Sequence, residues 1–275
     1  MKKHLLLYAL VFSLSVSAQL RFDYPTKEIE PAKLIVTYSL KFQEDSLNSE
    51  YIRKEDMLLF LGEKTSKFIS KNYFELDTLL RKIKSFSEYE LMISGPNKRT
   101  SSTAFRHQTF KNYPKGKLTC IEHIIDGTFK YEENMGLFNW QLTNETATLY
   151  GYKVQKATTE FGGRKWIAWF APELPFRDGP YKFNGLPGLI VKVNDSRNHY
   201  VYEFISIKKP LIHTMIDYRE KDFIVATKQD FFRAEDAFRA DIINRAKAAG
   251  LNDELQQRAA RNLARKNNPI ELKRK

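Results

Sequence analysis

Apolar and polar residues alternate along much of this chain. Between residues 33 and 43, every even-numbered position from Leu34 to Phe42 is apolar. Successive side chains of a β-strand point to opposite faces, so this spacing predicts a strand with one buried face. Similar alternation, or a high content of β-branched and aromatic residues between turn residues, predicts further strands at 57–61, 66–70, 104–113, 117–125, 128–133, 138–142, 152–160, 165–171, 189–193 and 200–207.

Other segments show a period close to 3.6 residues. Residues 72–84 place their large apolar side chains on one side of a short amphipathic helix. Thr227 stands three residues before Asp230, as in a capping box, and an apolar stripe then continues to Gly250. We predict one helix over this stretch and a second that follows Gly250 and ends before Asn267.

These elements place the chain in the α+β class, with mainly antiparallel strands. Many short strands and one early helix predict a curved or half-open, barrel-like sheet with a C-terminal helical appendage. We divide the chain into a leader at 1–18, an antiparallel β domain at 19–226 and a basic helical C-terminal segment at 227–275.

The N-terminus has the composition of a secretory signal peptide. Lys2 and Lys3 precede an apolar run at 5–14, and small residues lead to Ala18. This run is too short to span a bilayer. We therefore expect cleavage near Ala18 and a mature protein in the periplasm or outside the cell.

The chain is basic, with a formal net charge of +12. Such a charge often indicates nucleic-acid binding, but export argues against that partner. Anionic lipid head groups or an acidic protein partner fit an exported chain better, and solubility alone is a further interpretation. Arg258, Arg261 and Arg265 share one face of the last helix, so we expect this face either to contact an anionic membrane or acidic partner or to be merely solvated.

Few residues have the spacing of a chemical site. The histidines are scattered without metal-ligand spacing: His107, His123, His199 and His213. The single cysteine, Cys120, permits no internal disulfide, and the sequence has no nucleophilic-serine elbow or phosphate loop. We expect no metal, no cofactor and no catalytic residue. The alternative is an envelope enzyme that uses Glu173 and Asp178, the carboxylates of the 173–184 loop, as acid and base.

The stretch at 185–190, Gly-Leu-Pro-Gly-Leu-Ile, leads into a β-strand. Phosphate-binding loops lead instead into a helix, whose free N–H groups meet the anion. Pro187 and Gly188 fit the central positions of a type II turn, which requires a positive φ at Gly188. Gly185 would permit a close approach of two chain segments. The apolar members are expected to anchor this scaffold motif on the core: Leu186, Leu189 and Ile190.

These six residues spell the name of the GLPGLI family of exported bacteroidete proteins, which this chain resembles over nearly its whole mature length. The resemblance rests on residues 151–190, on the ending "RKNNPIEL" at 265–272, on "YSLKF" at 38–42 and on the leader. It implies an uncharacterised family without assigned catalytic residues.

At the level of the fold, a long antiparallel sheet that wraps an early helix is similar to the half-open barrels of periplasmic lipoprotein carriers. This analogy implies a concave apolar face that holds lipid. We expect Tyr38, Leu40 and Phe42 on that face. Trp166 and Trp169 lie on opposite faces of their strand, so one of them points outward and either contacts a ligand or packs under the 171–184 loop.

The expected function is therefore that of a non-enzymatic binding or accessory factor. Its partner would be a lipid, a lipoprotein or an outer-membrane protein.

Overall fold

The computed structural model of the chain describes residues 24–94, 103–124 and 127–273. The expected signal peptide lies outside these ranges. Within them the strands are β1 (Thr26–Pro31), β2 (Leu34–Gln43), β3 (Ile52–Leu61), β4 (Ser66–Ser70), β5 (Gln108–Lys111), β6 (Lys117–Ile124), β7 (Gly127–Asn134), β8 (Gln141–Leu149), β9 (Tyr152–Phe161), β10 (Arg164–Ala171), β11 (Leu189–Asp195), β12 (Tyr200–Lys208), β13 (Met215–Arg219) and β14 (Phe223–Val225). The helices are α1 (Lys71–Leu80), α2 (Phe86–Ser94), α3 (Lys228–Ala240), α4 (Ile242–Ala248) and α5 (Asp253–Ala264).

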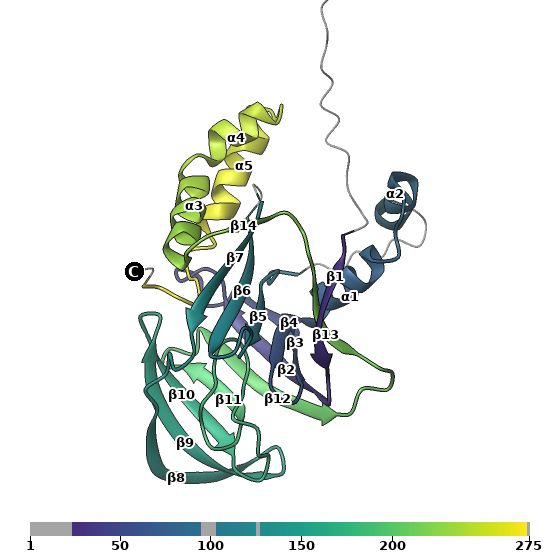
Figure 1. The fold of residues 1–275 in the computed structure, drawn as a ribbon. Coiled ribbons are helices and arrows are strands. Elements are labelled where there is room, and N and C mark those ends of the chain that lie inside the picture. The colour runs from purple at the N-terminus through teal and green to yellow at the C-terminus, as the bar shows by residue number, and fades with distance from the viewer. Residues whose placement is uncertain (1–23, 95–102, 125–126, 274–275) are drawn as a thin grey trace, which may run out of the picture.

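Twelve of these strands form one large, open sheet in the order β14-β7-β6-β5-β4-β3-β2-β12-β11-β10-β9-β8 (Figure 1). All neighbours are antiparallel except β14 and β7, which are parallel. The pairing of β2 with β12, in which Leu40 lies opposite Tyr202, joins the strands from β14 to β2 with those from β12 to β8. This architecture confirms the α+β class and the curved antiparallel sheet.

The concave, inner face of the sheet is filled by the chain itself. Alternate residues of β2, including Tyr38, Leu40 and Phe42, are buried there, as the period of two predicts. Residues 172–188 enter this hollow and pack Phe183 and Leu186 into the same core. The apolar face that suggested a lipid site is therefore largely covered by this loop.

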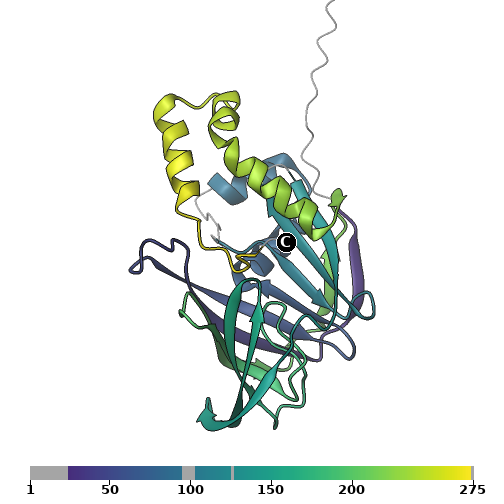
Figure 2. The same cartoon turned by 90° about the vertical axis from the view of Figure 1, so that its left-hand side faces the viewer.

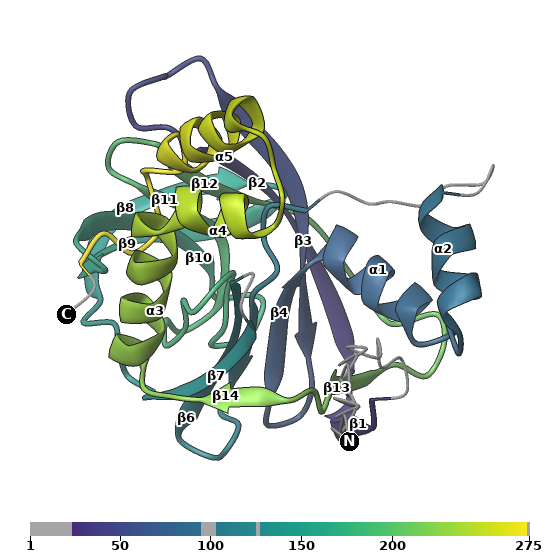
Figure 3. The same cartoon turned by 90° about the horizontal axis from the view of Figure 1, so that it is seen from above.

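The outer face carries a second apolar layer. Tyr73 of α1 packs there with Phe60 of β3 and Ile69 of β4. The two-stranded sheet of β1 and β13 adds Ile216 and Tyr218 to this layer. Figure 3 shows α1 and α2 on the opposite side of β3 and β4 from α3, α4 and α5. The expectation that the sheet wraps the early helix is therefore wrong, because α1 lies outside the hollow.

Several predicted boundaries shift. The strand expected at 138–142 is misplaced, because β8 begins at Gln141 and the Phe138 and Trp140 rings stack on each other with centroids 5.6 Å apart. The strand expected at 104–113 shortens to β5. The long helix expected from Thr227 to Gly250 divides into α3 and α4, because Asp241 leaves helical geometry with ψ at 12°.

The C-terminal segment returns to the sheet after α5 (Figure 2). Arg164 of β10 donates hydrogen bonds to the Asn268 side chain and to the carbonyls of Pro269 and Ile270. The Leu272 amide donates to the carbonyl of Gly162 at 2.6 Å. The C-terminal segment is thus hydrogen-bonded to the β9–β10 hairpin, which lies about a hundred residues earlier in the sequence. Among the described helices, none is long and apolar enough to cross a membrane.

Candidate functional site

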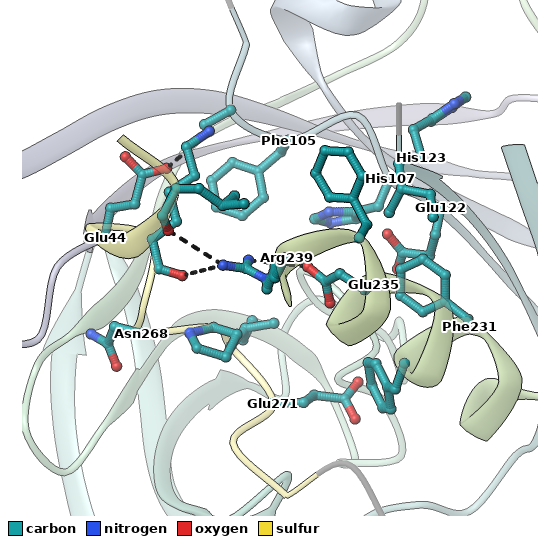
Figure 4. A pocket seen from close by; sticks show the side chains of 18 of the residues that line it. Glu44, Phe105, His107, Glu122, His123, Phe231, Glu235, Arg239, Asn268 and Glu271 are labelled. Atoms are coloured by element: carbon teal, nitrogen blue, oxygen red, sulfur yellow. Dashed lines mark hydrogen bonds and ion pairs between the residues drawn. The ribbon is translucent and has the colours of Figure 1, made fainter. Parts of the chain in front are cut away.

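A pocket of about 530 Å³ lies between the inner face of the sheet, the helices α3 and α5, and the C-terminal segment (Figure 4). Its walls combine aromatic and aliphatic side chains with several charged and polar groups. Six of the rings that line it are Phe42, Phe105, Tyr131, Phe231, Phe232 and Phe238. The pocket therefore offers a ligand an apolar surface that residues 172–188 leave uncovered.

Helix α3 supplies one wall of this pocket. Its capping box is present: the Asp230 amide donates to the Thr227 hydroxyl, and the Thr227 amide donates to the Asp230 carboxylate. The first turn then places Phe231 against Phe129 and Tyr131 of β7, with ring centroids 5.6 and 5.7 Å apart. This contact holds α3 against β7, next to the edge strand β14.

A buried ionic network borders the pocket. Lys182 lies between two carboxylates: it pairs with Glu133 of β7, and its Nζ is 2.7 Å from Oε1 of Glu271. Lys228 bridges the same two carboxylates, at 2.6 Å from each. Burial opposes the ionisation of Glu271, but the two lysines outweigh it and lower its pKa to about 2. Glu271 is therefore a permanently charged structural anchor.

Glu122 differs from these carboxylates. It lies on the inner face of β6 and lines the pocket, yet it makes no hydrogen bond or ion pair with any residue in the described ranges. Burial raises its pKa to about 8; Lys182 opposes this shift, while the nearby Glu235 and Glu271 carboxylates add to it. At neutral pH this carboxyl group is mostly protonated.

His107 is the neighbour of Glu122 across the sheet. Gln108 pairs with Ile121, and one step further in this register brings His107 opposite Glu122. The His107 side chain lines the pocket and is 8% exposed, and its Nε2 has no hydrogen-bond partner in the described part of the chain. Burial, with a smaller effect of Lys182, lowers its pKa to about 4, so the imidazole is neutral at pH 7.

The structure separates the residues that the sequence suggested as ligand contacts. Tyr38, Leu40 and Trp166 are fully buried in the inner core, and the Tyr38 hydroxyl donates to the Ile190 carbonyl at 2.8 Å. Trp169 is partly buried against the same core. Phe42 alone of these five lines the pocket.

The loop carboxylates of the enzymatic alternative have partners on neighbouring strands. Asp178 pairs with the buried Lys111 at 2.5 Å. Glu173 accepts a hydrogen bond from the Lys153 amide at 3.0 Å. Neither carboxylate lines the pocket. In the described ranges, no three His, Cys, Asp or Glu side chains gather in a way that could hold a metal ion.

The motif at 185–190 connects the loop to β11. Gly185 has a φ of +97°, whereas Gly188 does not have a positive φ. A Cβ at Gly188 would lie 2.3 Å from the carbonyl oxygen of Ala171. The expected type II turn is therefore wrong, and the two glycines exchange roles: Gly185 adopts the left-handed conformation and Gly188 permits the close approach. The apolar anchors are as expected, because Leu186, Leu189 and Ile190 are buried.

Sequence reasoning did not identify Glu122 and His107 as site residues. One signal was present: Leu118, Cys120 and Glu122 alternate along β6 on its inner face, so Glu122 places a carboxylate where a strand normally places an apolar residue. To place His107 near Glu122, one must know that β5 pairs with β6, and the sequence of neither strand shows this pairing.

Comparisons with known proteins identify a family signature over a short stretch of the chain. A family model described as "Protein of unknown function (Porph_ging)" matches residues 159–192, which include the motif at 185–190. A search of curated proteins finds no match.

Among solved structures, PNGF-II in its P21 crystal form is similar, with a TM-score of 0.51 and 15% identity over 74% of this chain and 33% of that one. Its C2 form gives a TM-score of 0.48 and 15% identity over 74% and 32%. This chain therefore spans about one third of the length of PNGF-II, and at this identity the likeness concerns the fold alone.

Proposed function

We propose that this chain is a non-enzymatic binding protein of the cell envelope that holds a ligand with a large apolar part, such as a lipid. The observation that carries this proposal is the aromatic pocket between the sheet, α3 and α5. Its volume of about 530 Å³ falls within the roughly 300–1,000 Å³ of small-molecule sites. Aromatic side chains give such sites much of their binding energy, since each ring offers a large apolar surface.

Export and family membership belong to the same proposal. The basic and apolar start of the chain supports cleavage near Ala18 and a periplasmic or secreted location. The motif at 185–190 and the ending at 265–272 support membership of the GLPGLI family. The enzymatic alternative gains no support from the pocket, because Glu173 and Asp178 do not line it and instead attach their loop to β9 and β5.

Filling the pocket should abolish ligand binding. Ala259 of α5 lines the pocket and is partly buried, so Ala259→Trp would place an indole ring in the space available to a ligand. We expect this variant to bind N-acetyl-dansylcadaverine, a neutral fluorescent probe with an apolar body, at least about tenfold more weakly than the wild type. Fluorescence titration of the full mature chain measures the dissociation constants.

Ala264→Trp is the matched control, because Ala264 is an exposed residue of the same helix that does not line the pocket. It should bind the probe as the wild type does. Equal binding by both variants, or a wild type that shows no saturable binding, would refute the proposed function.

The basic face of α5 is proposed as a contact for an anionic membrane surface. Arg258, Arg261 and Arg265 are all exposed. A basic residue near an anionic surface contributes about 1 kcal/mol, so replacing all three by Ala should weaken liposome binding by roughly tenfold to a hundredfold. Co-sedimentation with vesicles of equal parts phosphatidylcholine and phosphatidylglycerol would measure this, and binding should also fall with added salt.

A control variant removes the same charge elsewhere, at the exposed residues Lys54, Lys115 and Lys165. If it loses as much binding as the arginine variant, net charge rather than this face attracts the membrane. Unchanged binding by the arginine variant would show that the face is only solvated.

A further inference from the structure

Among the described residues, most of the carboxylates around the pocket are paired with a basic side chain, but one is not. Glu235 pairs with Arg239 at 3.1 Å, and Glu44 pairs with Arg53 at the same distance and with Lys266 at 3.8 Å. Glu271 is held by the two lysines of the buried network. His123 is hydrogen-bonded to the hydroxyls of Tyr73 and Thr128, whereas the Glu122 carboxylate and Nε2 of His107 have neither an ion pair nor a hydrogen bond within the described part of the chain.

We infer that the pocket selects ligands that carry a protonated nitrogen on an apolar or aromatic body, with Glu122 as the carboxylate that receives the nitrogen and His107 as a second acceptor. This inference rests on the proposed function and names the ligand class of the same pocket. Both side chains line the pocket, and the register of β5 with β6, continued by one step, brings His107 opposite Glu122, so we place the two acceptors at one polar corner of the pocket (Figure 4).

The ionised form of Glu122 has no paired cation among the described residues, so a cationic ligand would be its partner. Charged groups face Glu122 from several elements: Glu133 of β7, Glu235 of α3, Glu271 of the C-terminal segment and Lys182 of the inner loop. Burial is the main cause that raises the pKa of Glu122 to about 8, Lys182 opposes this rise, and the three carboxylates add smaller contributions to it. A cation placed beside Glu122 would offset the cost of its buried negative charge, because a nearby opposite charge favours the ionised form of a carboxyl group.

The remaining walls suit the same ligand. Phe105 and Phe231 line the pocket beside this polar corner, and the faces of aromatic rings attract ammonium groups. A neutral imidazole offers one nitrogen as an acceptor and does not repel a cation. Because the pKa of His107 is lowered to about 4, its ring keeps this neutral form throughout the range in which Glu122 titrates.

The proton on Glu122 gives ligand binding a defined pH dependence. A cationic ligand binds the ionised form of Glu122, so below pH 8 its binding must displace the proton from this residue. The affinity should therefore rise with pH, by up to about tenfold per unit between pH 6 and 8, and level off above pH 8. An anionic ligand would show the opposite trend, and a neutral ligand would show little dependence.

The test uses dansylcadaverine, which carries a primary ammonium group, and its N-acetyl derivative, which differs mainly by the loss of that charge. Fluorescence titrations of the full mature chain from pH 6 to 9 should show that the amine binds at least about tenfold more tightly at pH 8.5. Its affinity should rise with pH, whereas that of the acetylated dye should not.

Glu122→Gln should bind the two dyes with similar affinities and without pH dependence. Glu132→Gln is the matched control, because Glu132 is exposed on the neighbouring strand β7, and this variant should behave as the wild type. If the wild type binds both dyes equally at every pH, the inference is overturned while the proposed function stands.

Tighter binding of dansyl-undecanoate, strengthening as the pH falls, would also overturn the inference in favour of anionic ligands. If none of the three dyes binds, the proposed function fails and the inference fails with it. The wild-type titrations decide between these outcomes even if Glu122→Gln does not fold.

Discussion

Replacing Glu271 with Gln should lower the free energy of unfolding by about 3–5 kcal/mol, the usual effect of removing one partner from a buried ion pair. Glu271 is 4% exposed, and Lys182 is fully buried. Among the described residues, the substitution leaves Lys182 and Lys228 with Glu133 as their one carboxylate partner. Chemical denaturation of the full mature chain at pH 7 would measure the loss.

The effect should depend on pH in a defined direction. The pKa of Glu271 is lowered from 4.5 to about 2 in the folded state, so its charge stabilises the fold above pH 4.5. This contribution, about 3 kcal/mol by linkage, should disappear as the pH falls from 4.5 to 2. The stabilities of the wild type and Glu271→Gln should therefore converge over this interval.

Glu160→Gln is the control, because Glu160 is an exposed residue of β9 with a side chain that is 78% accessible. It should change the stability by less than about 0.5 kcal/mol. A Glu271→Gln variant as stable as the wild type at pH 7 would contradict a structural role for the network. A difference that stayed constant down to pH 2 would contradict the assigned titration.

The sequence was informative wherever a strand or helix has one buried face. The alternation in β2 gives its register directly, since its even-numbered residues fill the inner core. The elements that the sequence did not predict lack this contrast between a buried and an exposed face. Residues 86–94 form α2 although most of their side chains are exposed, and β1 pairs with β13 across nearly two hundred residues. Neither leaves a periodic signal in its own segment.

The pocket was less accessible to sequence reasoning because distant segments build it. Phe42, Glu122, Phe231 and Glu271 come from β2, β6, α3 and the C-terminal segment. Apolar residues on a strand predict burial, but they do not say whether a ligand or the protein itself covers them. At Tyr38 and Leu40 the cover is the loop at 172–188, a contact between segments more than 130 residues apart.

The motif at 185–190 also shows that contacts between distant segments cannot be inferred from a local sequence, here for single residues. Its composition indicated a scaffold, but it did not show which glycine meets which constraint. Gly185 has the positive φ, and a side chain there would lie no closer than 3.9 Å to Trp140. Gly188 has an ordinary φ but lies against the backbone of Ala171 and Pro172. The two positions should therefore respond differently to the same substitution.

Gly188→Ala should lower the free energy of unfolding by about 3 kcal/mol or more. The new Cβ would lie 2.3 Å from the Ala171 oxygen and 2.6 Å from its carbonyl carbon. These are backbone atoms at the end of β10, where Ala171 pairs with Leu189, so neither segment can move without disturbing the ladder. Gly185→Ala should cost less, about 1–3 kcal/mol, because it meets only an unfavourable φ.

Gly116→Ala is the control for the conformational effect alone, since Gly116 has a φ of +80° and no described atom lies within 4 Å of the position that a Cβ would occupy there. It should resemble Gly185→Ala and be clearly milder than Gly188→Ala in the same denaturation assay. Equal losses at positions 185 and 188 would contradict the steric explanation. A Gly188→Ala variant that unfolds like the wild type yet no longer binds N-acetyl-dansylcadaverine would show that the motif is part of a binding site rather than scaffold.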